Sequence, residues 1–173
     1  LLGIAYSAKE DYQPAEASFR NALLLQPENT EWRLGLTRCV FKQEKFQDAL
    51  VPVKTAIEMS AAPRESWIQL LAAVYIELRD YPNVAATLER LIELSPGKKQ
   101  YWVQLAAVQH HLERDAKAAA TLQLADEAAL LNEDREFRQL ARLLFLREQP
   151  YQCAKTVEEA LKSGVVKPDA ETY

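Results

Sequence analysis

Few residues in this sequence have both a type and a spacing that could carry out chemistry. The two histidines, His110 and His111, are adjacent. On a helix their side chains would point about 100° apart, so they could not chelate one metal ion as a pair spaced i, i+4 would. The two cysteines, Cys39 and Cys153, lie among apolar residues at helical spacing, which predicts buried, unpaired thiols. The histidines and cysteines therefore predict no metal site and no cofactor.

A catalytic role is also disfavoured by the motifs that the sequence lacks. It contains no G-x-S-x-G, H-E-x-x-H, P-loop or G-x-G-x-x-G pattern. Glu133, Asp134 and Glu136 cluster where a helix is predicted to begin, and carboxylates there complement the positive end of the helix dipole, so no calcium site is needed to explain them. We therefore predict that the chain is not an enzyme.

The composition predicts an all-α fold. Of the 173 residues, 49% are hydrophobic and 27% charged, only four are glycine, and Ala, Leu, Glu, Gln and Arg are abundant. The net charge of −4 comes without a block of basic residues, which disfavours nucleic acid as a partner. The longest nearly apolar run, Leu70–Ile76, is far shorter than the roughly 20 residues that cross a bilayer, so no membrane insertion is predicted for this segment.

One sequence pattern recurs along the whole chain. A leucine followed by a small or short residue stands at Leu2, Leu36, Leu71, Leu105 and Leu140, with spacings of 34, 35, 34 and 35 residues. Thirteen residues after each leucine comes a small or short apolar residue, as at Ala15, and four residues further a larger one, as at Phe19. These intervals place the two sets on facing stripes of two helices. Each copy is therefore a predicted helix–turn–helix unit.

The recurrence predicts a single array over 1–173, cut from a longer protein because the chain opens within the pattern. The predicted repeats span approximately 1–29, 30–64, 65–98, 99–133 and 134–167, and 168–173 begins a sixth. Trp32, Trp67 and Tyr101 recur in register near the starts of first helices, which predicts packing between repeats. Pro52 falls inside the second helix of the second repeat, and predicts a kink or a displaced helix start at a cost of about 3 kcal/mol.

The repeat resembles the tetratricopeptide repeat, whose helix–turn–helix unit is 34 residues long. The resemblance covers the whole chain and implies a right-handed α-solenoid of about five repeats with a concave groove. In that family certain positions of each first helix face the groove. Carried onto this sequence, they give the predicted partner-binding residues Leu34, Arg38, Phe41, Gln69, Ile76, Val103, His110, Arg138, Arg142 and Phe145.

From about Pro63 onward, phrases such as YWVQLAAV and PYQCAKTVEEALKSGVV also resemble a narrower group of bacterial proteins. That group accompanies the TonB–ExbB–ExbD energy-transducing system of the cell envelope. The resemblance implies a periplasmic or envelope location, with the cytoplasm as the alternative. It assigns a role to no single residue.

The predicted function is a non-catalytic scaffold that binds a peptide or helical segment of a partner protein in its groove. Apolar residues would anchor the segment, and Arg38 or Arg142 would contact a carboxylate. Two alternatives remain open at this stage. The chain could be a structural solenoid that self-associates through exposed ends near Leu2 and Val165, or a regulatory domain of a larger enzyme.

Overall fold

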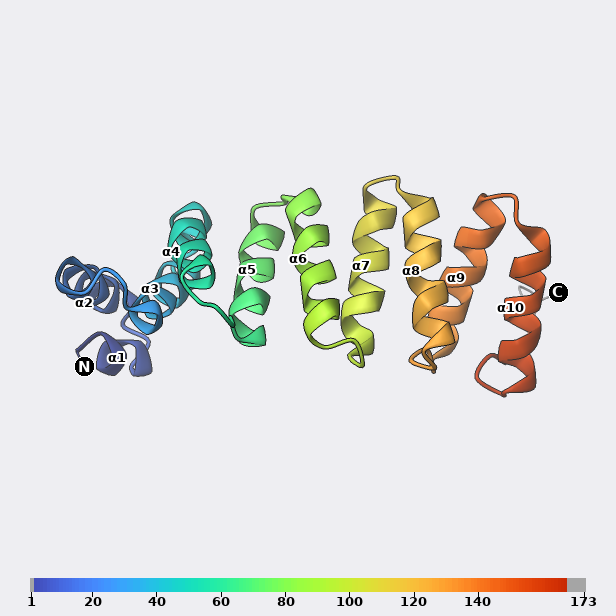
Figure 1. Cartoon of the computed structure of the whole chain (residues 1–173), viewed down its shortest axis with the longest axis horizontal. Helices are drawn as coiled ribbons and strands as arrows, with labels where there is room; N and C mark the ends of the chain where they lie inside the picture. Colours follow the sequence, from blue (N-terminus) through green and yellow to red (C-terminus); the bar gives the residue numbers. More distant parts are fainter. Residues whose placement is uncertain (1, 168–173) are drawn as a thin grey trace. The chain divides into compact units, whose positions relative to one another are not determined.

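A computed structural model of the chain describes residues 2–167, and these residues form ten α-helices and no strand (Figure 1). The helices are α1 (Leu2–Ala8), α2 (Tyr12–Leu25), α3 (Thr30–Lys42), α4 (Phe46–Glu58), α5 (Glu65–Glu77), α6 (Tyr81–Leu94), α7 (Lys99–His111), α8 (Asp115–Glu127), α9 (Asp134–Leu146) and α10 (Pro150–Lys162). The predicted all-α class is confirmed. Two helices lie within each of the five predicted repeat ranges, and the predicted start of a sixth repeat, 168–173, lies outside the described residues.

The chain divides into two compact units, 1–87 and 88–173, with the limit inside α6. In the first unit each helix from α1 to α4 packs on the helix that follows it, and α1 also contacts α3. In the second unit α7 packs on α8, α8 on α9 and α9 on α10. Among the helices described, none is both long enough and apolar enough to cross a lipid bilayer.

The recurring apolar positions form the core of each unit. The leucines Leu36, Leu71, Leu105 and Leu140 are between 0% and 8% exposed. The small residues opposite them on the second helices, Ala15, Ala49 and Ala118, are completely buried. Because an alanine side chain is so short, two helix backbones approach closely at these positions and the larger residues fill the remaining space. The facing stripes predicted from the spacing are therefore the packing surfaces.

In the first unit the ring of Phe19 on α2 lies close to two glycines. A Cβ atom added to Gly35 on α3 would lie 2.5 Å from Cζ of Phe19, and one added to Gly3 on α1 would lie 3.1 Å from the same ring. A carbon–carbon contact of 2.5 Å is far inside the normal van der Waals distance. The ring of Phe19 therefore packs against both α1 and α3. This packing leaves no room for a side chain at position 35, which explains the glycine there.

The five turns between the two helices of each repeat share one backbone conformation. At each turn a residue that is not glycine adopts a positive φ of between 55° and 60°; these are Glu10, Glu44, Arg79, Glu113 and Glu148. In the second repeat the amide of Glu44 donates to the carbonyl of Phe41, and the amide of Lys45 donates to that of Val40, each at 2.9 Å. The equivalent bonds recur at the other four turns. This is the Schellman arrangement, which satisfies the last carbonyls of a helix.

Pro52 does not displace the start of its helix, contrary to one of the two predicted effects. Helix α4 begins at Phe46, six residues before Pro52, and stays helical through it to Glu58. Pro52 is buried, and the helix packs on α3 and α5. Tertiary packing on both sides thus holds a helix across a residue that cannot donate the amide hydrogen bond to Asp48.

An ion-pair cluster fastens α2 to the turn that precedes α4. The carboxylate of Glu16 accepts hydrogen bonds of 2.9 Å from Lys45, Arg20 and Gln43. Partial burial of Glu16 favours its neutral form, but these three donors outweigh that effect and hold the pKa of the carboxyl group below its ordinary value of 4.5.

The contact between Phe19 and Gly35 predicts that a single methyl group there destabilises the protein. Alanine would favour the helix by about 1 kcal/mol, but overpacking against a buried ring costs about 1–3 kcal/mol, so we expect Gly35→Ala to lower the free energy of unfolding. In Gly97→Ala the added Cβ would meet nothing within 4 Å. This control should change the free energy by less than about 0.5 kcal/mol in urea titrations. Equal stability of the two variants would contradict the packing described.

The cluster around Glu16 predicts a dependence of stability on pH. Because the pKa of Glu16 is lowered in the folded protein, its contribution is complete above the unfolded-state pKa and is lost as the pH falls through the folded-state pKa. We expect Glu16→Gln to be less stable than the wild type near neutral pH, and the difference to disappear once the pH falls below the lowered folded-state pKa of Glu16. Urea unfolding measured across this range checks the prediction, with Glu89→Gln on α6 as the control. A difference that persists at the acidic end would contradict it.

Candidate functional site

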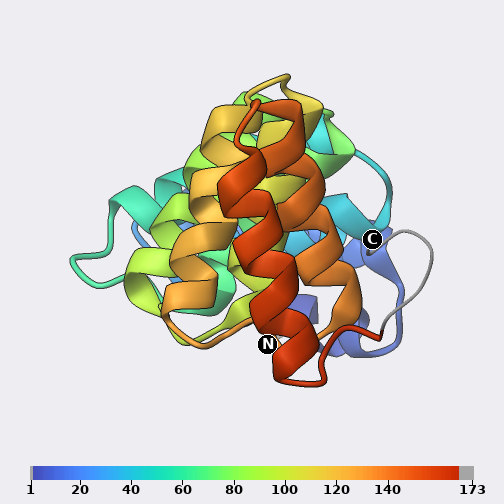
Figure 2. The ribbon, with the colours of Figure 1, turned by 90° about the vertical axis from the view of Figure 1, so that its right-hand side faces the viewer.

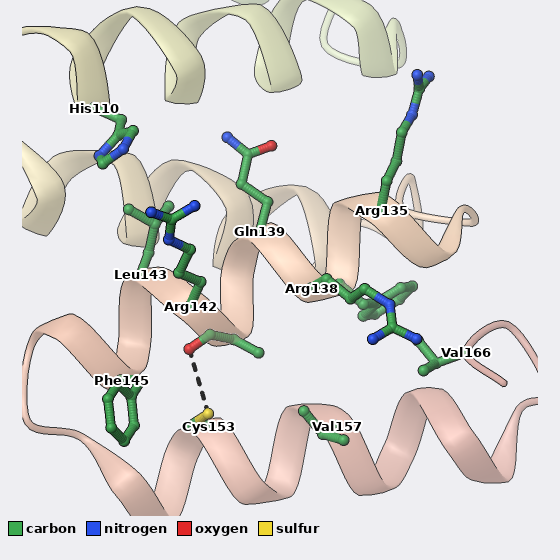
Figure 3. A pocket seen from close by; sticks show the side chains of 12 residues that line it. His110, Arg135, Arg138, Gln139, Arg142, Leu143, Phe145, Cys153, Val157 and Val166 are labelled. Atoms are coloured by element: carbon green, nitrogen blue, oxygen red, sulfur yellow. Dashed lines mark hydrogen bonds between the residues drawn. The ribbon is translucent and has the colours of Figure 1, made fainter. Parts of the chain in front are cut away.

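A cavity of about 670 Å³ opens between α9 and α10, with a residue of α7 at its rim (Figure 3). We call it the α9–α10 pocket. Its lining includes Arg138, Arg142 and Phe145 from α9, Cys153 and Val157 from α10, and His110 from α7. In Figure 2, α10 lies in front of α9, and no described helix covers its outward side. The pocket therefore combines one face of α9 with the face of α10 that carries Cys153 and Val157.

Three arginines of α9 line the pocket because their spacing places them on one side of the helix. Arg135, Arg138 and Arg142 are separated by three and four residues, which is the interval that brings helical side chains together. Arg138 donates to Asp134 at 2.7 Å, and Arg135 pairs with Glu133 at 2.8 Å.

Arg142 is exposed and makes no ion pair with any residue that the structure describes. Within the described part of the chain, the lining of the pocket includes no aspartate or glutamate. Arg142 therefore contributes a positive charge to the pocket that no described carboxylate balances, although the chain as a whole carries a net charge of −4.

The apolar part of the pocket comes from residues that are only partly covered. Phe145 is 70% exposed, and Cys153 and Val157 are half-buried. Val157 occupies the same repeat position as Phe19, Val53 and Leu122, which are at most 5% exposed. At those positions the side chain is covered by neighbouring helices, whereas on α10 the described residues leave part of this apolar surface uncovered.

The start of α9 is fixed by a buried carboxylate. Glu136 is 2% exposed, accepts 3.0 Å hydrogen bonds from the amides of Asn132 and Glu133, and pairs with Lys99 of α7 at 2.9 Å. Lys99 also pairs with Glu133 at 2.8 Å. These hydrogen bonds raise the pKa of the Lys99 ammonium group and lower the pKa of Glu133. The arginine face of α9 is thus anchored to α7.

This buried carboxylate stands where the second, third and fourth repeats carry an aromatic residue. Trp32, Trp67 and Tyr101 occupy the position that Glu136 holds in the last repeat. Trp67 and Tyr101 are 6% and 3% exposed. In the last repeat a salt bridge with Lys99 therefore takes the place of aromatic packing. The sequence analysis predicted that Glu133, Asp134 and Glu136 stabilise the positive end of the helix dipole. For Glu136 this prediction is incomplete, because its carboxylate also forms a buried ion pair with Lys99.

The two thiols have different surroundings, and neither is activated. Cys39 is buried and lies 3.1 Å from the hydroxyl of Ser7, as predicted for a buried cysteine. Cys153 is only half-buried, and its thiol donates to the carbonyl of Ala141 at 3.3 Å, so its predicted burial was wrong in degree. Both thiols are free, and burial raises the pKa of each. A raised pKa keeps a thiol protonated and a weak nucleophile.

His110 contacts a carboxylate at the turn between α7 and α8. Its Nδ1 lies 2.5 Å from Asp115. Among the residues that the structure describes, no group of three or more His, Cys, Asp or Glu side chains could hold a metal ion.

Four of the ten predicted groove residues come together in the α9–α10 pocket: His110, Arg138, Arg142 and Phe145. A fifth, Arg38, lines a separate cavity of about 460 Å³ between α1 and α3 in the first unit. That cavity, the α1–α3 pocket, also contains Lys42 and Glu31, so its lining carries both signs of charge. Arg38 occupies the same repeat position in its helix as Arg142 does in α9.

Leu34 was assigned wrongly to the groove. It is 0% exposed, because α3 packs on α2 and α4 and also contacts α1, so more of the helix surface is buried than one inner stripe. Val103 is half-buried against the core of the second unit. Phe41 is half-buried and packs edge-to-face on Phe46, with ring centroids 5.3 Å apart.

The two remaining predicted groove residues are exposed. Ile76 is 48% exposed, and Gln69 donates to Glu65 at 3.4 Å.

The prediction missed the α10 side of the pocket. Cys153 and Val157 belong to the inward stripe of a second helix, which the repeat pattern assigns to the core. Arg135 and Gln139 also line the pocket and were not predicted. The spacing of Arg135, Arg138 and Arg142 was visible in the sequence and could have indicated an arginine face on α9.

This chain is similar to known proteins in sequence over its first part and in fold over most of its length. Residues 1–62 match the family model of the tetratricopeptide repeat. A crystal structure of MamA is similar to this chain with a TM-score of 0.69 at 16% identity, over 94% of each chain. YrrB, described as a tetratricopeptide-repeat protein with an unusual peptide-binding site, has a TM-score of 0.68 at 14% identity, over 98% of this chain and 85% of its own. No curated protein sequence matches significantly. The structural likeness confirms the predicted fold class, an all-α solenoid of tetratricopeptide type.

The anchor at the start of α9 predicts a dependence between two substitutions. Lys99→Met leaves the carboxylate of Glu136 buried without its cation, so we expect a lower melting temperature. Adding Glu136→Tyr removes the buried charge and restores the aromatic type of the second, third and fourth repeats, and should recover part of the loss. Lys117→Met, at an exposed position of α8, is the control. Thermal unfolding followed by circular dichroism measures all four proteins. A double variant that melts no higher than Lys99→Met alone would contradict the pairing.

Proposed function

We propose that the chain is a non-catalytic scaffold that binds a peptide or helical segment of a partner protein on its first helices, with the α9–α10 pocket as a main contact. The observation that carries the proposal is the gathering of His110, Arg138, Arg142 and Phe145, predicted separately as groove residues, around one cavity of about 670 Å³. A site that combines an exposed aromatic residue with arginines is typical of protein recognition.

Two further observations support a binding role over a catalytic one. The described residues offer arginines, apolar surface and weakly nucleophilic thiols at the pocket, a set that suits recognition. A solenoid of this type presents an extended surface in which each repeat contacts its neighbours, and such surfaces bind proteins and peptides. YrrB, with the same fold, is described as having a peptide-binding site.

The location of this scaffold in the cell remains a prediction from the sequence. The resemblance from about Pro63 onward implies the bacterial envelope and the TonB system. Neither the family match nor the similar structures support that narrower assignment. The proposal of a protein-binding scaffold does not depend on it.

Self-association is a second candidate, favoured by exposed apolar residues in the first unit. Leu24 and Leu25 at the end of α2 are 83% and 85% exposed, and Leu2 is 68% exposed. Large exposed apolar side chains that lie close together often mark contact surfaces. Sedimentation at several protein concentrations distinguishes the two candidates, because self-association makes the apparent mass rise with concentration.

The scaffold proposal predicts that Phe145 contributes to partner binding and little to folding. The whole chain is used to capture partners, the bound segment is mapped, and its affinity is measured by calorimetry with the purified segment. We expect Phe145→Ser to weaken binding about tenfold, and more when combined with Phe41→Ser, while helicity is kept. Leu124→Ser, at a position 53% exposed on α8 and outside the pocket, is the matched control. Undiminished affinity of the double variant for the mapped segment would refute the proposal.

A further inference from the structure

The α9–α10 pocket combines two properties that restrict the kind of segment it could bind. The first is its charge: Arg135, Arg138 and Arg142 line it, and among the described residues no carboxylate does. Two of these arginines are paired with Glu133 and Asp134, which leaves Arg142 as the exposed cation with no ion pair among the described residues. An anionic group bound there would gain a charge-assisted contact without breaking a pair with any residue that the structure describes.

The second property is an apolar surface beside this cation. Phe145 lies one helical turn beyond Arg142, and Cys153 and Val157 face the same cavity from α10 (Figure 3). At the equivalent position to Val157, Val53 and Leu122 are 0% exposed because neighbouring helices cover them. Among the described residues, two apolar side chains of α10 are therefore only half-covered beside Arg142, and they offer a contact for an apolar group of a partner.

We infer that the α9–α10 pocket binds an acidic amphipathic helix, with an apolar residue against Phe145, Cys153 and Val157 and a carboxylate on Arg142. This inference rests on the proposed scaffold function and names the class of its partner. An acidic helix fits both properties at once, because residues three or four positions apart on a helix present an apolar and a charged group to the same surface. A basic helix would meet the arginines with like charge.

The α1–α3 pocket is a natural comparison for this charge argument. Arg38 occupies the same repeat position as Arg142, but Glu31 also lines its pocket, and the floor residue Phe19 is only 5% exposed. With mixed charges and a covered floor, that pocket lacks both properties. We therefore expect the acidic helix to bind at the α9–α10 pocket and not at the α1–α3 pocket, although both carry an arginine at the same repeat position.

Three fluorescein-labelled peptides test the inference on the whole chain by fluorescence anisotropy. One is an amphipathic peptide of leucine and glutamate, the second replaces glutamate by lysine, and the third replaces leucine by serine. We expect the leucine–glutamate peptide to bind, the other two to bind at least about tenfold more weakly, and added salt to weaken the binding. Equal binding of the lysine peptide would overturn the inference.

Charge-reversal variants then locate the site. Arg142→Glu, at an exposed position, should weaken binding of the leucine–glutamate peptide by about tenfold or more. Arg38→Glu makes the same change at the same repeat position of the other pocket and should have little effect. Circular dichroism checks that both variants fold. If Arg38→Glu abolished binding and Arg142→Glu did not, the pocket would be assigned wrongly.

Cys153 supplies an independent reporter inside the pocket. It is half-buried in the lining, whereas Cys39 is 1% exposed, so modification by a maleimide should be faster at Cys153. The bound leucine–glutamate peptide should slow modification of Cys153, measured by mass spectrometry, and this protection should be lost in Arg142→Glu. A peptide that binds without protecting Cys153 would overturn the inference. The scaffold proposal would survive that result if Phe145→Ser still weakened binding of the mapped partner segment, so the two failures are distinguishable.

Discussion

The structure depends on close approach between neighbouring helices at positions that carry small side chains. Ala15, Ala49 and Ala118 are completely buried at these contacts, and Gly35 leaves room for the ring of Phe19. A single helix pair cannot bury both sides of its first helix, so each pair needs the next one to complete its core. This constraint explains why one pattern recurs at nearly constant intervals, while the residues that face away from the contacts differ from copy to copy.

The same constraint decides what could be predicted from the sequence. Packing demands a small residue or a leucine at fixed intervals, so the helix pairs could be located from spacing alone. The exposure of individual side chains could not be predicted in this way, because it depends on how many other helices each helix contacts. Leu34 is buried because α3 contacts three helices, and Val157 is only half-buried although its counterparts are covered. The burial of Glu136 and its salt bridge escaped prediction for a different reason, since its partner Lys99 lies on another helix.

The α9–α10 pocket shows how a recognition site can arise in a regular fold without special loops. Its arginines come from helical spacing, and its apolar floor comes from core positions that remain partly open. The rigid helices fix these side chains in place, so a partner would lose entropy on binding but the scaffold would lose little. The buried Glu136 contributes by fixing the first turn of α9 to α7. Helix α9 thus carries both the residues that line the pocket and the residue that fixes the helix to α7.

The recurring turn has an energetic consequence for how much of the chain can fold by itself. At each of the five turns an exposed glutamate or arginine holds a positive φ, a conformation that disfavours a residue with a side chain by roughly 1–2 kcal/mol. Summed over five turns, this strain is roughly 5–10 kcal/mol, comparable with the net stability of an ordinary domain. An isolated helical hairpin would bear its share of strain with only half of its packing partners. Each repeat therefore needs the packing contacts of its neighbours in order to stay folded, and we expect folding to be cooperative over several repeats.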